Sequence, residues 1–320
     1  MHCIISNKAV LQLTGEDRLT FLQGQITADV STLNQGESGM GCLCSAKGKT
    51  WAILTIFAED DRYLLVTDSG CLDNTLRELR KYAVFSKVDI QEVSESFHLL
   101  GLMSSTIPLT VSAALQQTAQ TDTLPSAHWQ TSQIIQNSDV TWVTSFTIPE
   151  NRFLVLTAKN SPVSEAITAL PQSPLSQWDA QHIQAGIPQL NAQQSEEYIP
   201  QMMNLQALNA ISFTKGCYMG QEVVARTKYL GKNKRAGCIL VSAESVTVAP
   251  GDTLELQLGE NWRRIGKCLY CATDNQHTWV FAVLPNDLET DAVIRLQGIA
   301  SSRFTLMPLP YALDDTKIAQ

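Results

Sequence analysis

The chain lacks any run of apolar residues that approaches the roughly 20 needed for a membrane-spanning helix. Its start, MHCIISNKAVLQLTG, also lacks the basic segment followed by a long apolar one that directs proteins to export. Eight cysteines in such a chain indicate reduced thiols rather than a disulfide framework. We therefore expect a cytoplasmic protein without a membrane partner.

Positive charge is also scarce, with 23 Lys and Arg against 31 Asp and Glu and a net charge of −8. A general nucleic-acid binder needs an overall or strongly patterned positive surface, so this balance argues against that class. One segment departs from it, because no Asp or Glu occurs between 223 and 243 while five basic residues do: Arg226, Lys228, Lys232, Lys234 and Arg235. Such a segment holds an anionic ligand, touches RNA phosphates or is simply a solvated loop.

Nucleotide and metal motifs are missing as well. No G-x-G-x-x-G or Walker A string occurs, and the five histidines form no H-x-x-x-H or H-E-x-x-H pattern. Cys268 and Cys271 form a C-x-x-C, but positions three apart on a strand point to opposite faces. We therefore expect no metal site in this chain.

The first part of the sequence predicts a mixed α/β unit. Residues 9 to 13 alternate as a strand does, and Thr14 can cap a helix from Glu16 to Gly24. Three further strands and a helix follow, at 39–46, 50–57, 62–67 and 71–82. Hairpin turns at 47–49 and 59–61 join these three strands.

The next part predicts a second mixed unit. It has strands at 96–103, 140–148 and 152–158 and helices at 110–118 and 161–170. Residues 116 to 138 are rich in Gln, Thr and Ser and indicate a surface excursion with weak structure.

After the break at 171–174, Ser176 can cap a helix that places Trp178, His182 and Ala185 on one face and ends at Gly186. From about 237 onward, six short strands separated by turns predict an antiparallel barrel. The fold class is α+β. We expect three modules: 1–95 completed by 176–236, then 96–175, then 237–320.

The most informative stretch is ISFTKGCYMGQEVVAR, residues 211 to 226. Gly216 and Gly220 allow a tight turn and close approach to a ligand, and the residues after them favour a helix. Cys217 then lies between the ammonium of Lys215 and a helix start, two influences that favour a reactive thiolate. The alternative is a buried structural cysteine in a turn shaped by glycines.

The string KGCYMGQE at 215–222 resembles the signature of the YgfZ family of folate-binding proteins, bacterial relatives of the glycine-cleavage T-protein (aminomethyltransferase). Similar segments cover nearly the whole chain, at 23–30, 45–49, 81–88, 176–188, 199–208, 259–267 and 308–313.

The resemblance implies a ring of three modules, two of ferredoxin-like α/β type and one barrel, with a folate in the central opening. It makes Trp178 the stacking surface for the pterin. Glu222 becomes a partner for the pterin's donor edge, and the segment from Arg226 a holder of the glutamate tail. Lys47, at a hairpin tip, is a site residue through resemblance alone. We expect folate to lie between Trp178 and the turn at 215–226, with the thiol of Cys217 on the cavity wall.

The family also has a second tryptophan shortly before the first helix. The corresponding place here is near Asn7 or Lys8, and no Trp occurs before Trp51. This departure puts the second half of the folate site in doubt.

The resemblance implies an accessory protein that binds tetrahydrofolate or a derivative and supports iron-sulfur enzymes, including those that modify tRNA. Cys217 would act there as nucleophile, transient cluster ligand or redox group. The alternative is a true aminomethyltransferase, whose chemistry needs a carboxylate near the folate. In the T-protein it follows the strand that corresponds to 62–67, where an ungapped match gives Thr75 and a slip of two residues gives Asp73. A third possibility is an RNA-binding module built on 226–235, with direct tRNA contact.

Overall fold

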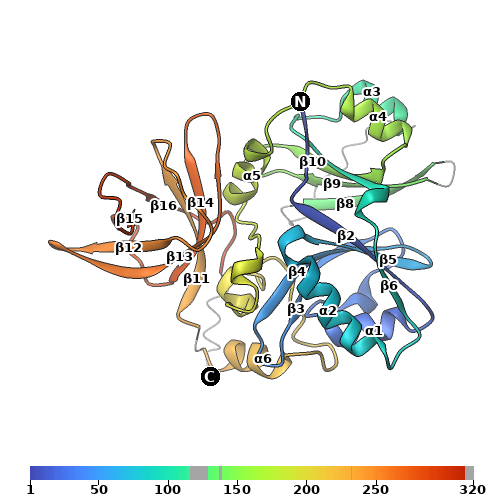
Figure 1. Ribbon diagram of the computed structural model, residues 1–320, viewed down its shortest axis with the longest axis horizontal. Coiled ribbons are helices and arrows are strands. Elements are labelled where there is room, and N and C mark those ends of the chain that lie inside the picture. The colour runs from blue at the N-terminus through green and yellow to red at the C-terminus, as the bar shows by residue number, and fades with distance from the viewer. Residues whose placement is uncertain (116–128, 137–138, 232, 314–320) are drawn as a thin grey trace.

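The computed structural model describes residues 1–115, 129–136, 139–231 and 233–313. Within these ranges the strands form two five-stranded sheets and one six-stranded sheet, and every pairing of named strands is antiparallel. Figure 1 shows the six-stranded sheet on one side and the two five-stranded sheets stacked on the other. The expected α+β architecture is confirmed.

The first five-stranded sheet has the order β3-β4-β5-β2-β6. Its strands are β2 (Lys8–Thr14), β3 (Ser38–Cys44), β4 (Thr50–Ala58), β5 (Arg62–Asp68) and β6 (Asp89–Glu92), and its helices are α1 (Arg18–Gln25) and α2 (Leu72–Ala83). The hairpins at 47–49 and 59–61 are as predicted. The predicted cap of α1 is wrong, because Asp17 occupies the N-cap position and the helix continues past Gly24.

The second sheet has the order β1-β7-β10-β9-β8. Its elements are β1 (His2–Ile4), β7 (Phe97–Leu102), β8 (Trp129–Gln136), β9 (Asp139–Phe146), β10 (Arg152–Ala158), α3 (Leu109–Ala114) and α4 (Pro162–Thr168). Ser161 caps α4 through a bond from the Ser164 amide. The expectation of weak structure over 116–138 is wrong for 129–136, which form β8; residues 116–128 and 137–138 lie outside the described residues.

The first strand of the chain pairs with this second sheet rather than the first. Residues 2–4 therefore do not lie in the unit to which the sequence assigned them. The module boundaries otherwise stay a prediction.

The C-terminal sheet has the order β15-β12-β13-β14-β11-β16. Its strands are β11 (Arg235–Ser242), β12 (Thr253–Leu258), β13 (Asn261–Thr273), β14 (Thr278–Pro285), β15 (Ile294–Leu296) and β16 (Thr305–Met307). An isolated bridge between Ile294 and Phe304 brings the two edges of the sheet toward each other. The curved sheet encloses a core of its own that includes Leu240, Val280 and Leu254.

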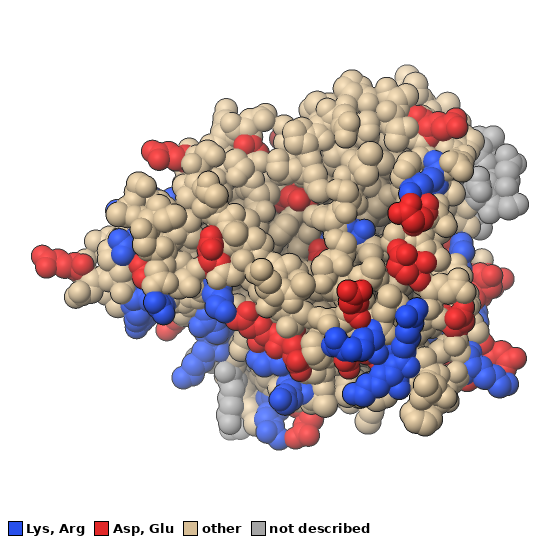
Figure 2. Space-filling model, in the orientation of Figure 1, with Lys and Arg blue, Asp and Glu red and all other residues tan. Residues whose placement is uncertain are grey.

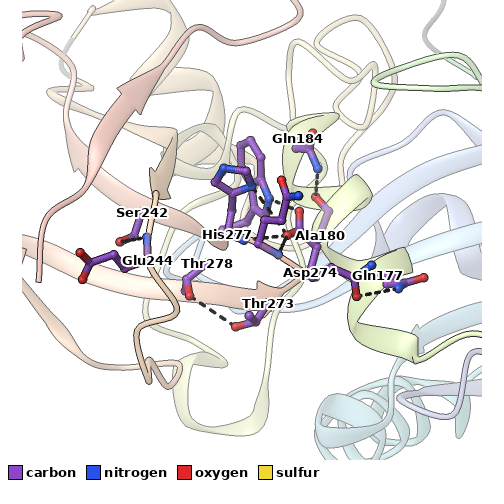
Figure 3. Close-up of polar contacts among 12 residues, drawn as sticks. Gln177, Ala180, Gln184, Ser242, Glu244, Thr273, Asp274, His277 and Thr278 are labelled. Carbon is purple, nitrogen blue, oxygen red and sulfur yellow. Dashed lines mark hydrogen bonds and ion pairs between the residues drawn. The ribbon is translucent and has the colours of Figure 1, made fainter.

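Helix α5 (Leu175–Gln184) lies where these parts meet, and α6 (Gln221–Tyr229) lies at the lower edge of the molecule in Figure 1. Helix α5 begins after Pro174, so Ser176 is inside the helix and the predicted cap is wrong. The side chain of Gln177 in α5 donates from Nε2 to Asn275 Oδ1 at 3.2 Å, and Asn275 lies in the turn between β13 and β14. Figure 3 shows Gln177 beside this turn, which Asp274 closes by accepting bonds from the amides of the next residues. Helix α5 thus joins the barrel to the core between the other two sheets.

Candidate functional site

The inner cavity lies between the two five-stranded sheets, and Trp178 of α5 is one of its walls. Its volume is about 70 Å³. The lining combines apolar residues with a few polar side chains, among them Lys8, Asp68, His182 and Gln189. Such a lining is typical of a small-molecule site, but the cavity reaches the usual size of about 300–1,000 Å³ only together with the opening that adjoins it.

The indole of Trp178 is held tightly and is only 1% exposed. A Cβ on Gly101 of β7 would lie 2.6 Å from the ring, so only glycine fits beneath it. The ring of His182 lies 5.5 Å away, one helical turn along α5, and Phe146 meets the indole edge-on at 6.0 Å. Trp178 therefore contributes a wall to the cavity, and its role as the stacking surface for a pterin stays a prediction.

Arg152 of β10 lies behind this wall with its guanidinium 5.4 Å from the Trp178 ring and 4.7 Å from the Phe146 ring. It is fully buried, and burial lowers its pKa to about 9. Burial also holds the pKa of His182 well below its usual range, so this imidazole is neutral and its Nδ1 accepts from Arg152 at 3.4 Å. The guanidinium fixes the orientation of both rings of α5 that face the cavity.

An outer opening of about 770 Å³ adjoins the inner cavity, and the two share Ser38, Gly39 and Met40 of β3. Its other walls come from 28–37, 207–212 and the C-terminal segment 310–312. The volume lies within the range of about 300–1,000 Å³ seen for ligand pockets. Tyr311 lines this opening, and its hydroxyl donates to the carbonyl of Gly186, just after α5, at 2.6 Å.

Cys217 lies elsewhere, in a shallow depression formed by Gly24, Ala46 and residues 217–222. The thiol is exposed, whereas Trp178 is buried, and the depression at Cys217 shares no lining residue with the inner cavity. The expectation that the turn and the indole face each other across one cavity is therefore wrong. The predicted turn and helix are present, because α6 begins at Gln221 directly after Gly220.

Gly220 and Gly48 bring two distant motifs together. Gly220 has φ of +82°, and a Cβ there would lie 2.5 Å from the Ser45 carbonyl oxygen. A Cβ on Gly48 would lie 2.7 Å from Cβ of Val223 in α6. The hairpin at 45–49 thus packs directly on the start of α6, beside the thiol.

Replacing Gly220 with Ala is expected to lower the free energy of unfolding by about 2 kcal/mol, because it adds backbone strain and a clash with Ser45. Gly216→Ala is the matched control: nothing lies within 4 Å of a Cβ there, and its φ is not in the left-handed range. Denaturant unfolding of both variants measures the difference. If the two variants were equally stable, the structure would not require a glycine at position 220.

Lys215 holds the turn in place. Its Nζ donates to the carbonyls of Gln23 at 2.6 Å, Ile26 at 3.0 Å and Ala28 at 2.6 Å, which uses all three of its donors. Burial lowers its pKa to about 8, so the ammonium form still predominates at neutral pH. These contacts fix the end of α1 against the turn, and they leave no donor of Lys215 for the thiol.

The remaining predicted residues near the turn are exposed. Glu222 and Arg226 pair with each other at 2.6 Å on the surface of α6, and neither lines the inner cavity or the outer opening. Lys47 is exposed at the hairpin tip. Glu222 lines the depression at Cys217, and none of Lys47, Glu222 and Arg226 lines the cavity of Trp178.

The basic segment 226–235 is partly used inside the fold. Lys228 lies 3.9 Å from the centre of the Phe213 ring, and Arg235 donates to the carbonyls of Ile265 and Val283 at 2.6 and 2.7 Å. Figure 2 shows Lys and Arg mixed with Asp and Glu over the lower part of the molecule, where Figure 1 places α2 and α6. This face lacks the single-sign field expected of a dedicated RNA-binding module.

The prediction that Cys268 and Cys271 point to opposite faces of their strand is wrong. A β-bulge between Cys268 and Tyr270 adds one residue to β13, so Cys268 and Cys271 point to the same face. The thiols interact, and the hydrogen bond to Cys271 together with burial raises the pKa of Cys268. Two thiols are still an incomplete metal site, and the described residues contain no group of three or more His, Cys, Asp or Glu suited to a metal ion. Nor do they contain a helix long and apolar enough to cross a membrane.

Comparisons with known proteins cover both ends of the chain. The model of the GCVT N-terminal domain matches residues 5–148, and that of the YgfZ beta-barrel domain matches residues 233–298. The tRNA-modifying protein YgfZ of Yersinia pestis (strain Pestoides F) is 41% identical over 313 residues, which is 97% of this chain and 92% of that protein. The protein of the same name from Yersinia enterocolitica (serotype O:8 / biotype 1B) is 40% identical over the same shares.

The chain belongs to the YgfZ family. Its fold is that of the glycine-cleavage T-protein: the aminomethyltransferase T from Bartonella henselae matches with a TM-score of 0.64 over 97% of this chain and 85% of that one, at 16% identity.

Of the two positions that the sequence suggested for the family's second tryptophan, Lys8 lines the same inner cavity as Trp178 and Asn7 does not.

The carboxylate expected of an aminomethyltransferase is not at the matching place. Thr75 is buried in α2 and its hydroxyl donates to the Cys71 carbonyl, while Asp73 is exposed on the same helix. Neither lines the inner cavity or the outer opening; the carboxylates that do are Asp68, Asp29 and Glu37.

Sequence reasoning missed Asp68 and Gln189 in the lining of the cavity and Arg152 behind its Trp178 wall. Asp68, Gln189 and Arg152 carry no recognisable motif, and only the fold places them near Trp178. Tyr311 could have been found, because it lies in one of the segments, 308–313, that resemble the YgfZ family.

Proposed function

We propose that this protein binds a folate and serves as an accessory protein in tRNA modification by iron-sulfur enzymes, with the thiol of Cys217 as a functional group. A role in tRNA modification is supported by the family, since the similar Yersinia proteins are named tRNA-modifying proteins. One observation carries the folate part: Trp178 walls a cavity between the two five-stranded sheets, and this cavity adjoins a larger opening lined by 28–40, 207–212 and 310–312.

The proposal assigns two separate surfaces. The pterin enters the inner cavity through the outer opening, and the rest of the folate lies in that opening. The thiol stays free on the other side of β3 and its neighbours, in the depression beside α6. A client protein can therefore reach Cys217 while folate is bound.

Titration of the purified protein with 5-formyltetrahydrofolate, followed by calorimetry, tests the folate part. We expect saturable binding at one site per chain. If millimolar 5-formyltetrahydrofolate gave no heat of binding, the proposal that this protein binds a folate would be refuted. A parallel assay of one-carbon transfer from an aminomethyl donor tests the aminomethyltransferase alternative. This chain has Thr75 where the ungapped match expects the catalytic carboxylate, so we expect no transfer under conditions in which a T-protein is active.

The outer opening makes a prediction about the glutamate tail. Its described lining includes Asp29 and Glu37 and contains no Lys or Arg. Hydrogen bonds from Ser31 and Gln23 hold the pKa of Asp29 below its usual range, so this carboxylate is charged at neutral pH. Added glutamates therefore meet negative charge at the cavity mouth.

We expect a triglutamyl folate to bind no more tightly than the monoglutamate. Competition calorimetry of the two ligands measures the ratio. A tenfold gain from the longer tail would show that a basic surface, such as the one that begins at Arg226, holds it instead.

A further inference from the structure

We infer that Lys8, Asp68 and Gln189 form a polar edge of the inner cavity that binds the hydrogen-bonding edge of a planar heterocycle. These side chains share the cavity with Trp178, which supplies the flat apolar wall. The inference rests on the proposed folate function and names the residues that would select the ring.

Lys8 and Asp68 form an ion pair at 2.6 Å, with side chains 18% and 11% exposed. Asp68 Oδ2 also accepts from the amide of Leu190 at 3.0 Å. Within the described part of the chain, Lys8 Nζ has no other hydrogen-bond partner. Two of its three N–H donors and one acceptor position on each Asp68 oxygen are thus available to a ligand.

Gln189 provides the independent observation. It is 4% exposed, lines the cavity, and its side-chain amide makes no hydrogen bond to any described residue. Its carbonyl and its NH₂ both keep some accessible surface, so they face the cavity and are free to bond to a ligand there.

The combined groups match one type of ring. A pyrimidinone edge, such as that of a reduced pterin, presents a ring carbonyl beside an N–H and an amino group. The ammonium of Lys8 can donate to the carbonyl, and the carboxylate of Asp68 can accept from the N–H or the amino group. Gln189 can supply either role. The polar edge thus binds the edge of the ring, and Trp178 contacts its face.

The test compares folic acid with aminopterin, which differ in carrying a 4-oxo or a 4-amino group on the pterin. The unmodified protein is expected to prefer folic acid about tenfold, because an amino group cannot accept from Lys8. Lys8→Met should remove the preference, and Gln189→Leu should weaken both ligands about fivefold. Lys87→Met is the control, since Lys87 forms an exposed ion pair with Glu16 away from the cavity.

Melting curves check that each variant is folded before titration. Failure of the unmodified protein to bind either ligand would refute the proposed function and this inference with it. If the unmodified protein binds, but Lys8→Met and Gln189→Leu both match the Lys87→Met control, folate binding stands and the polar edge is refuted.

Discussion

Replacing Cys217 with Ser is expected to abolish the support that this protein gives to tRNA thiomethylation while leaving its melting temperature unchanged within about 2 °C. The thiol is exposed in a shallow depression, so its removal costs no core packing. A hydroxyl is a far poorer nucleophile, redox group and soft-metal ligand than a thiol, and function should therefore fall whichever of these roles applies.

The measurement is the level of thiomethylated nucleosides in tRNA from cells that depend on the variant. Cys238→Ser is the matched control, because Cys238 is a half-buried thiol in β11 that does not line the depression at Cys217. Full modification with Cys217→Ser would show that the exposed thiol does no chemistry, and it would remove Cys217 from the site.

Replacing Trp178 with Leu is expected to weaken folate binding at least about tenfold, because it removes the flat aromatic wall of the inner cavity. It should also remove most of the fluorescence quenching that folate causes. Binding is measured by calorimetry and quenching by titration of the indole emission.

Trp142→Leu is the control for general damage to the core. Trp142 is also 1% exposed and belongs to the same hydrophobic cluster, but it does not line the inner cavity. Both variants leave a hole of similar size, so their losses of stability should be similar. Equal affinities in the two variants would show that folate does not contact Trp178.

Much of the fold could be predicted from the sequence because its signals are local. Alternation gave β2, and helical spacing gave α2, each within about two residues of its observed bounds. Caps were less predictable. Thr14 and Ser176 have suitable side chains, yet the chain begins α1 and α5 at positions set by packing around Gly15 and Pro174.

The bulge in β13 shows a different limit. Face assignments on a strand assume an unbroken alternation, and one extra residue between Cys268 and Tyr270 reverses them for every residue that follows. Nothing in the local string KCLYCAT marks the bulge, so the relation of Cys268 to Cys271 could be known only from the pairing with β14.

The site was predictable in its parts and not in its arrangement. Trp178 and Cys217 both stand out through resemblance, yet no sequence pattern says whether they share a cavity. The ammonium of Lys215, expected beside the thiol, is instead held by three carbonyls at the end of α1. The match of Asn7 or Lys8 to the family's second tryptophan stays a prediction, although Lys8 lines the cavity.

A crystal structure of the protein with 5-formyltetrahydrofolate tests the central claim most directly. The account predicts electron density for the pterin ring in the cavity walled by Trp178 and Lys8, with the rest of the molecule in the opening beside Tyr311 and Cys217 uncovered. Pterin density in the depression between Ala46 and α6, with the inner cavity empty, would contradict it.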